Sequence, residues 1–122
     1  MLIIVAHGSH DPNWRASVEN VAESLQADFG PEGVQLAYMD CTPPTLGDVV
    51  SEAVRKGVVR IRVLPLFLAN EGHVDRDIRP AVDEVRAVHP AANIDLLPAV
   101  GQNHFFREML AKLVLDEDES DA

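Results

Sequence analysis

The chain lacks several features that would place it in a special class of protein. It has one cysteine, Cys41, in 122 residues, which excludes an intramolecular disulfide framework and a cysteine-rich zinc module. No apolar run approaches the roughly 18 to 20 residues of a membrane-spanning helix, and the short apolar start lacks the basic flank and cleavage site of a signal peptide. We therefore expect a globular protein of the cytoplasm with no membrane partner.

Basic residues are scarce relative to acidic ones. The sequence has 10 Lys and Arg against 20 Asp and Glu, a formal net charge of -10. Nucleic acids are bound by clustered Lys and Arg, so a nucleic-acid partner is not expected. Half of the acidic excess comes from five residues near the C-terminus: Asp116, Glu117, Asp118, Glu119 and Asp121. We expect a single folded domain over residues 1–115 and a disordered acidic tail over residues 116–122.

What the chain does contain is a strand pattern followed by a helix pattern, four times over. The strand patterns are apolar runs, at residues 2–6, 34–39, 58–68 and 94–97. The helix patterns have apolar residues at helical spacing, at residues 13–29, from Thr42 or Pro43 to Gly57, at about 75–88 and at about 104–115. This alternation predicts an α/β fold, with a four-stranded, mainly parallel sheet and helices on both faces.

The loops that follow the four strands carry most of the chemically versatile residues. In open parallel sheets, ligands bind outside the carboxyl ends of the strands. Four of the five histidines lie at this predicted edge: His7, His10, His73 and His104. Histidine with carboxylate is the ligand set of borderline divalent metals, and imidazole is also the usual proton acceptor near neutral pH. The pattern therefore indicates metal chemistry, proton transfer or both.

Structural roles for the same residues remain open. His10 could lie at the lip of the first helix. Either Asp40 or His73 could cap the helix that follows it. Cys41 is also explained as a small buried residue, and Glu71 as a solvated loop acid.

Two other enzyme classes fail on the spacing of the first loop. Ser9 follows His7 closely, but it lacks the flanking glycines of a nucleophile elbow. Gly8 stands alone in its turn and no P-loop lysine follows it, so a phosphate-binding loop is also unsupported. Metal chemistry is the class that these comparisons leave.

Three segments of the chain resemble the short CbiX/SirB family of class II tetrapyrrole chelatases. They are VAHGSHDPNWR, AYMDCTPPTL and VLPLFLANEGHVDRDI, in the order in which the family has them. The resemblance extends to about Leu115, and its third segment is the most specific. It implies insertion of a divalent metal into sirohydrochlorin, on the route to cobalamin or sirohaem. The metal, Co²⁺ or Fe²⁺ with Ni²⁺ not excluded, would be a substrate, and no tightly bound cofactor is implied.

The resemblance also implies roles for individual residues. His7 and His73 would bind the incoming metal and accept the pyrrole protons. Asp40 stands where the family usually has a glutamate and would be a third ligand. Because the aspartate side chain is shorter than that of glutamate, Glu71 could supply the carboxylate that reaches the metal. By their position in the sequence, and not from the resemblance, the candidates for contact with the substrate's carboxylates are Ser9, Arg15, Arg76 and Arg79, with His10 as an accessory residue at the rim.

The size of the chain bears on its assembly. Larger chelatases have two similar halves that face each other across a cleft, and the short forms resemble one half. The resemblance therefore implies a homodimer with the tetrapyrrole between protomers. A noncatalytic carrier of the metal or the tetrapyrrole, with the same fold and histidines, is the alternative function.

Overall fold

The computed structural model describes the whole chain except residues 40–41, 69–71, 73 and 121–122, and it describes residues 117–120 by backbone alone. Its centre is a four-stranded sheet made of β1 (Leu2–Ala6), β2 (Val34–Tyr38), β3 (Arg60–Pro65) and β4 (Asn93–Leu96). The strands pair in the order β2-β1-β3-β4, and every pairing is parallel. The predicted parallel α/β sheet is therefore confirmed.

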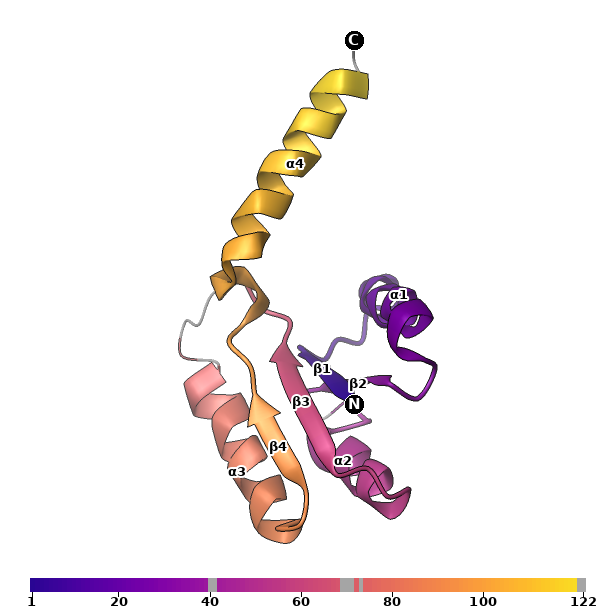
Figure 1. Cartoon of the computed structure of the whole chain (residues 1–122), viewed down its shortest axis with the longest axis vertical. Coiled ribbons are helices and arrows are strands. Elements are labelled where there is room, and N and C mark those ends of the chain that lie inside the picture. The colour runs from indigo at the N-terminus through magenta and orange to yellow at the C-terminus, as the bar shows by residue number, and fades with distance from the viewer. Residues whose placement is uncertain (40–41, 69–71, 73, 121–122) are drawn as a thin grey trace.

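Helices cover both faces of the sheet, as predicted. The helices are α1 (Pro12–Phe29), α2 (Leu46–Arg55), α3 (Arg79–Val88) and α4 (His104–Ser120), with a π-helical turn η1 (Val74–Ile78) and a 3₁₀ turn η2 (Val100–Gln102). Helix α1 lies on one face of the sheet, and α2 and α3 lie on the other (Figure 1). Helix α4 leaves the carboxyl edge of the sheet and projects beyond the rest of the molecule (Figure 1).

The core lies in two layers, one on each side of the sheet. All five residues of β1 are buried because this strand has neighbours on both sides and helices on both faces. Ile3 and Val5 face the larger layer, toward α2 and α3, while Leu2 and Ile4 face the layer under α1. This alternation follows from the two-residue period of a strand. A strand buried on both faces holds the loop that follows it firmly in place.

Helix α2 begins later than the sequence prediction of Thr42 or Pro43. Its N-cap is Thr45, whose hydroxyl accepts a hydrogen bond from the Asp48 N–H at 3.2 Å. The Asp48 carboxylate accepts one from the Thr45 N–H at 3.1 Å in return. This reciprocal capping box satisfies two backbone donors at the helix start. The capping role considered for Asp40 therefore belongs to Thr45.

The third strand is shorter than the predicted 58–68, and the last helix is longer than the predicted 104–115. Val58 donates its N–H to the Ala53 carbonyl at 3.0 Å, which ties it to the turn after α2 and keeps it out of the sheet. Helix α4 continues to Ser120, so most of the acidic segment expected as a disordered tail is helical. Once a helix has formed, each further residue adds a hydrogen bond, and glutamate is a good helix former.

Candidate functional site at the carboxyl edge

The strand order creates a crevice at the carboxyl ends of β1 and β3. The chain passes from β1 to β2 on one side and then returns to β3 on the other, so the order reverses between β1 and β3. Such a switch point is where open α/β sheets bind ligands, because the two loops leave it in opposite directions. His7 is the first residue after β1 and therefore lies at this point.

His7 is half-buried and packs against an aromatic ring from the loop after β3. The centroids of the His7 and Phe67 rings are 4.6 Å apart, and the ring planes are inclined at 57°. Phe67 in turn packs against the larger core layer. The contact restricts the orientation of the imidazole and leaves it partly accessible. The sequence analysis missed Phe67, because its position at the end of a long apolar run is equally typical of an ordinary strand residue.

The rest of the first loop is held by its own hydrogen bonds. The Ser9 hydroxyl oxygen accepts the Asp11 N–H at 3.0 Å, and the Asp11 carboxylate accepts the Asn13 N–H at 2.9 Å, capping α1. Ser9 keeps its own O–H as a donor for a ligand. His10 is exposed and directly precedes Asp11, the N-cap of α1.

Arg15 stands at the carboxyl end of β2, on the α1 side of the sheet. Its guanidinium carbon lies 5.7 Å from the centroid of the Tyr38 ring, in the range of a cation–π contact. Two buried polar atoms here, Arg15 Nε and Tyr38 Oη, have no hydrogen-bond partner among the residues that the structure describes. Buried polar groups normally have partners.

The other two candidate arginines lie around η1 and the start of α3. Arg76 folds back on Gly72, to whose carbonyl its Nε donates at 3.3 Å. Gly72 has a positive φ of 86°, and a side chain there would press on the Arg76 guanidinium. Arg79 pairs with Asp75 at 3.1 Å, with both side chains more than half exposed. Arg76 thus lies beside the third loop, whereas Arg79 is already neutralised on the surface.

The predicted metal ligands are only partly placed by the structure. Asp40, Glu71 and His73 lie outside the described residues, so their positions relative to His7 stay predictions. Among the residues that are described, no three His, Cys, Asp or Glu side chains lie close enough to hold a metal ion. His104 opens α4 at the same edge of the sheet and is exposed.

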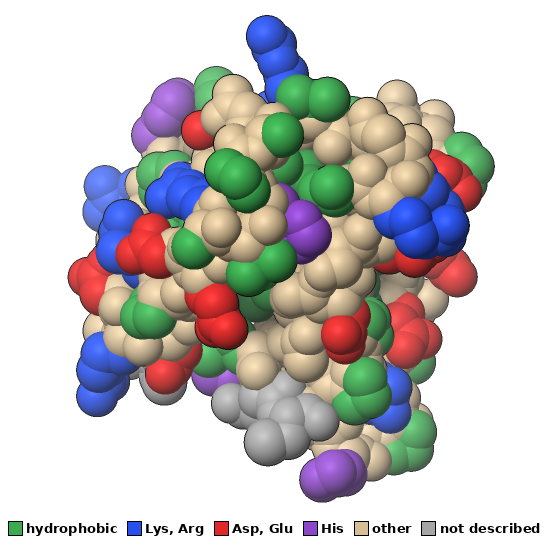
Figure 2. Space-filling model, turned by 90° about the horizontal axis from the view of Figure 1, so that it is seen from below, with side chains coloured by type: hydrophobic (Ala, Val, Ile, Leu, Met, Phe, Trp, Pro, Cys, Tyr) green, Lys and Arg blue, Asp and Glu red, His purple; other side chains and the backbone are tan. Residues whose placement is uncertain are grey.

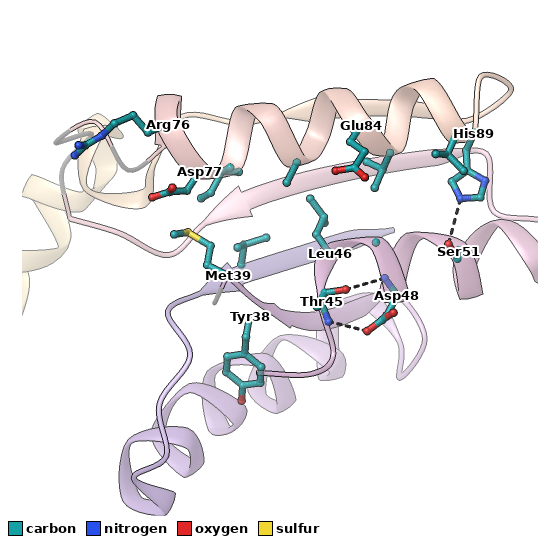
Figure 3. Close-up of a pocket in the computed structure, with 16 residues that line it drawn as sticks. Tyr38, Met39, Thr45, Leu46, Asp48, Ser51, Arg76, Asp77, Glu84 and His89 are labelled. Carbon is teal, nitrogen blue, oxygen red and sulfur yellow. Dashed lines mark hydrogen bonds between the residues drawn. The ribbon is translucent and has the colours of Figure 1, made fainter. Parts of the chain in front are cut away.

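A cavity of about 560 Å³ lies between α2 and α3. Figure 3 shows Arg76 and Asp77 at one of its ends and the hydrogen-bonded pair Ser51 and His89, 3.2 Å apart, at the other. Met39, at the end of β2, brings one wall of the cavity to the carboxyl edge of the sheet. His7 is not among the residues that line it. The cavity therefore adjoins the switch point from the α2 and α3 side without including the histidine.

Charges elsewhere on the described surface are mixed. Viewed from the amino edge of the sheet, Lys and Arg side chains interleave with Asp and Glu side chains (Figure 2). On α2, a hydrogen bond from Arg55 lowers the pKa of the Glu52 carboxyl and raises the pKa of the guanidinium. This pair lies at the C-terminal end of α2, away from His7. No helix of the described chain has the length and apolarity to cross a membrane.

The fold and the position of His7 define an open-sheet α/β protein with a histidine at its switch point, and comparison with known proteins gives its family. The CbiX family model matches residues 1–117. The chain belongs to the CbiX family, as its three segments indicated.

Curated relatives of the chain are named sirohydrochlorin cobaltochelatase. The protein of Methanopyrus kandleri is 38% identical over 77 residues, which cover 63% of this chain and 54% of that protein. The chain thus spans about half the length of this relative. The protein of Saccharolobus islandicus strain L.S.2.15 is 29% identical over 119 residues, covering 93% of this chain and 91% of that protein.

Solved structures have the same fold. A CbiX protein from Marinobacter aquaeolei VT8 aligns with a TM-score of 0.84 and 31% identity, covering 99% of this chain and 96% of that one. The sirohydrochlorin chelatase SirB from Bacillus subtilis subspecies spizizenii, in complex with cobalt, aligns with a TM-score of 0.72 at 21% identity. That alignment covers 80% of this chain and 42% of SirB, so this chain matches less than half of the larger protein.

Proposed function

We propose that this protein inserts Co²⁺ or Fe²⁺ into sirohydrochlorin, in the biosynthesis of cobalamin or sirohaem. The observation that carries the proposal is a half-buried histidine at the switch point of a CbiX-family sheet. The names of the curated relatives support the substrate, and SirB structures with cobalt and with Fe³⁺ support the kind of metal. Ni²⁺ stays open, and the cytoplasmic location stays a prediction.

The residue types suit the chemistry of metal insertion. The reaction exchanges two pyrrole N–H protons for one M²⁺ ion, so the site must loosen water from the ion and accept two protons. We propose that His7 and His73 do this, first as neutral ligands and then as bases. Asp40 would be the third ligand, with Glu71 as an accessory carboxylate. With only two histidines and one carboxylate as ligands, the ion can be transferred to the macrocycle. A closed site of four protein ligands would retain it.

The position of His7 also supports a site shared between two chains. His7 lies at the sheet edge, directly after β1, and is not among the residues that line the cavity between α2 and α3. We propose a homodimer in which two such edges face each other with the tetrapyrrole between them. The metal is then a substrate, and no tightly bound cofactor is needed.

Metal insertion is expected to change the visible spectrum of sirohydrochlorin, and this is the direct test. Purified protein with sirohydrochlorin and Co²⁺ or Fe²⁺ should metallate the macrocycle faster than the same mixture without protein. The alternative function, a noncatalytic carrier, would bind the tetrapyrrole or the metal without accelerating the reaction. Binding measured by fluorescence titration, together with the uncatalysed rate, would therefore contradict the enzyme and support the carrier.

Arginine variants should separate substrate binding from catalysis. Arg15→Gln and Arg76→Gln are expected to raise KM about 5- to 30-fold with a smaller change in kcat, because each loses one charged hydrogen bond of about 1 to 2 kcal/mol. Arg79→Gln should have a smaller effect, since Asp75 already pairs with Arg79. Steady-state rates at varied sirohydrochlorin concentration measure this difference.

The control for these variants is Arg55→Gln, which removes a paired arginine at the far end of α2. Its KM should equal that of the unmodified protein. An equal rise in KM for Arg15→Gln and Arg55→Gln would indicate a general effect of net charge and remove Arg15 from the substrate site.

A further inference from the structure

Backbone hydrogen bonds hold the end of β1 on both of its sides. On the β3 side, the Leu66 N–H donates to the Val5 carbonyl at 2.8 Å. On the β2 side, the Met39 N–H donates to the Ala6 carbonyl at 2.8 Å, and this carbonyl belongs to the peptide that precedes His7. The backbone that enters His7 is therefore fixed. The freedom that remains to the imidazole is rotation about its two side-chain torsions.

The register of the sheet brings Phe67 beside His7. Strands β1 and β3 pair in one register up to Val5 and Pro65. The same register, carried past the strand ends, sets His7 opposite Phe67. Register partners in a parallel sheet turn their side chains to the same face, and Phe67 packs against the core layer under α2 and α3. The two rings meet there, with their centroids 4.6 Å apart.

Phe67 is held in turn by the connection between β4 and α4. The Gly101 N–H donates to the Phe67 carbonyl at 2.9 Å. Gly101 lies so close to the Leu68 carbonyl that a side chain at residue 101 would overlap it. The Phe67 side chain is half-buried against the core layer. A ring that is anchored through its backbone and through the core is a firm support for the imidazole beside it.

We propose that Phe67 is a positioning residue for metal insertion, whose ring holds the His7 imidazole in one orientation at the switch point. The proposal rests on the proposed function, in which His7 binds the metal and then accepts a pyrrole proton. Both steps need a ring nitrogen aimed at a fixed point, because metal ligation and proton transfer are directional. Phe67 has no group that binds a metal or takes a proton, so its contribution passes through His7.

The advantage of a held imidazole is that its orientation is set before the substrate arrives. A freely rotating side chain would lose rotamer freedom when it binds the metal, and that loss would raise the barrier to the reaction. A displacement of about 1 Å in such a group lowers the rate by about 10²-fold. The same ring contact leaves the macrocycle's carboxylates to other residues, so Phe67 should affect kcat more than KM.

Two substitutions of Phe67 separate the ring from its apolar volume. Phe67→Leu keeps an apolar side chain without the ring, and it should lower kcat for Co²⁺ insertion into sirohydrochlorin about 10- to 100-fold, with KM changed less than about 3-fold. Phe67→Tyr keeps the ring and should retain kcat within about 3-fold of the unmodified protein. An equal loss of kcat in the two variants, or a rise in KM with kcat unchanged, would overturn the proposal.

The matched control is Phe29→Leu, which removes a ring far from His7. Phe29 is 50% exposed and ends α1, at the opposite edge of the sheet. Its kcat and KM should stay within about 3-fold of the unmodified protein. Urea denaturation followed by circular dichroism gives the stability of each variant, so that rates are compared between folded proteins. Equal losses of kcat in Phe29→Leu and Phe67→Leu would overturn the positioning role.

NMR of the histidine rings tests the contact without any reaction. In a chain labelled with ¹³C-histidine, without metal or tetrapyrrole, the His7 signals are those that His7→Ala removes. Phe67→Leu should move them, because the ring current of Phe67 is lost, and Phe67→Tyr should leave them nearly in place. The signals of His89, the C-cap of α3, should not move in either variant. His7 signals that ignore Phe67→Leu would overturn the proposal.

The two measurements distinguish the failure of this proposal from the failure of the proposed function. An unmodified chain that inserts no metal would refute the function, while the NMR comparison would still decide whether Phe67 holds the His7 ring. A chain that inserts metal but whose kcat is the same after Phe67→Leu would refute the positioning role and leave the function standing.

Discussion

His7→Ala is expected to lower the rate of metal insertion by about 10²- to 10⁴-fold, the usual contribution of a positioned acid–base group. In the proposed mechanism His7 is both a metal ligand and a base, so the loss of activity should appear in kcat as well as in kcat/KM. The fold should not change, because His7 is a half-buried loop residue outside the core clusters. Rates should be measured from the spectrum of sirohydrochlorin with Co²⁺, alongside circular dichroism.

The control for His7→Ala is His10→Ala, in the same loop. His10 is exposed, so its removal should leave the rate within about 3-fold of the unmodified protein, as expected for a surface residue outside the site. Binding of Co²⁺ measured by calorimetry gives a second readout, which His7→Ala should weaken and His10→Ala should not. If both variants insert metal at the normal rate, His7 is not in the reaction.

Gly101→Ala should reduce the free energy of unfolding by about 2 to 4 kcal/mol, the range of a substitution that forces the backbone apart. A methyl group at residue 101 would overlap the carbonyl oxygen of Leu68. To avoid it, η2 must move away from the end of β3 and lose the hydrogen bond from Gly101 to Phe67. Because Phe67 packs on His7, the same movement should also lower the rate of metal insertion. Urea denaturation followed by circular dichroism gives the stability.

Gly47→Ala is the control for the effect of adding a methyl group to a glycine. Gly47 lies in the first turn of α2, and the nearest atom to an added methyl would be 3.8 Å away, an ordinary contact. Alanine is a better helix former than glycine, so this variant should be unchanged or up to about 1 kcal/mol more stable. Equal destabilisation by the two substitutions would show that Gly101 is not closely packed in solution.

Much of the fold was predictable because its signals are local. The apolar run at residues 2–6 and the helix pattern at residues 13–29 predicted the bounds of β1 and α1 nearly to the residue. The late start of α2 was also readable, since Thr45 and Asp48 stand at the spacing of a capping box. The early end of β3 was not readable, because Leu66 and Phe67 are as apolar as the strand before them. The strand ends at Pro65 because the register with β1 ends there.

The location of the candidate site and its residue types were predictable, but the contacts between its side chains were not. Histidines after strand patterns indicated the carboxyl edge, and the structure confirms that position for His7. Nothing in the sequence indicated that Phe67 would lie against His7, or that Arg15 would lie over Tyr38. These contacts join segments that are far apart in the chain, and side-chain periodicity carries no information about such pairs.

Local patterns were therefore enough to establish the alternating α/β order, the CbiX resemblance and the histidine after the first strand. They depend on neighbouring residues, whose spacing reflects the geometry of helices and strands. The strand order β2-β1-β3-β4, which makes the end of β1 a switch point, was decided by the tertiary structure alone. So was the exposure of the apolar side chains of α4, such as Phe105 and Leu113: their spacing predicts a helix with an apolar face, but only the packed molecule shows that its own sheet does not cover that face.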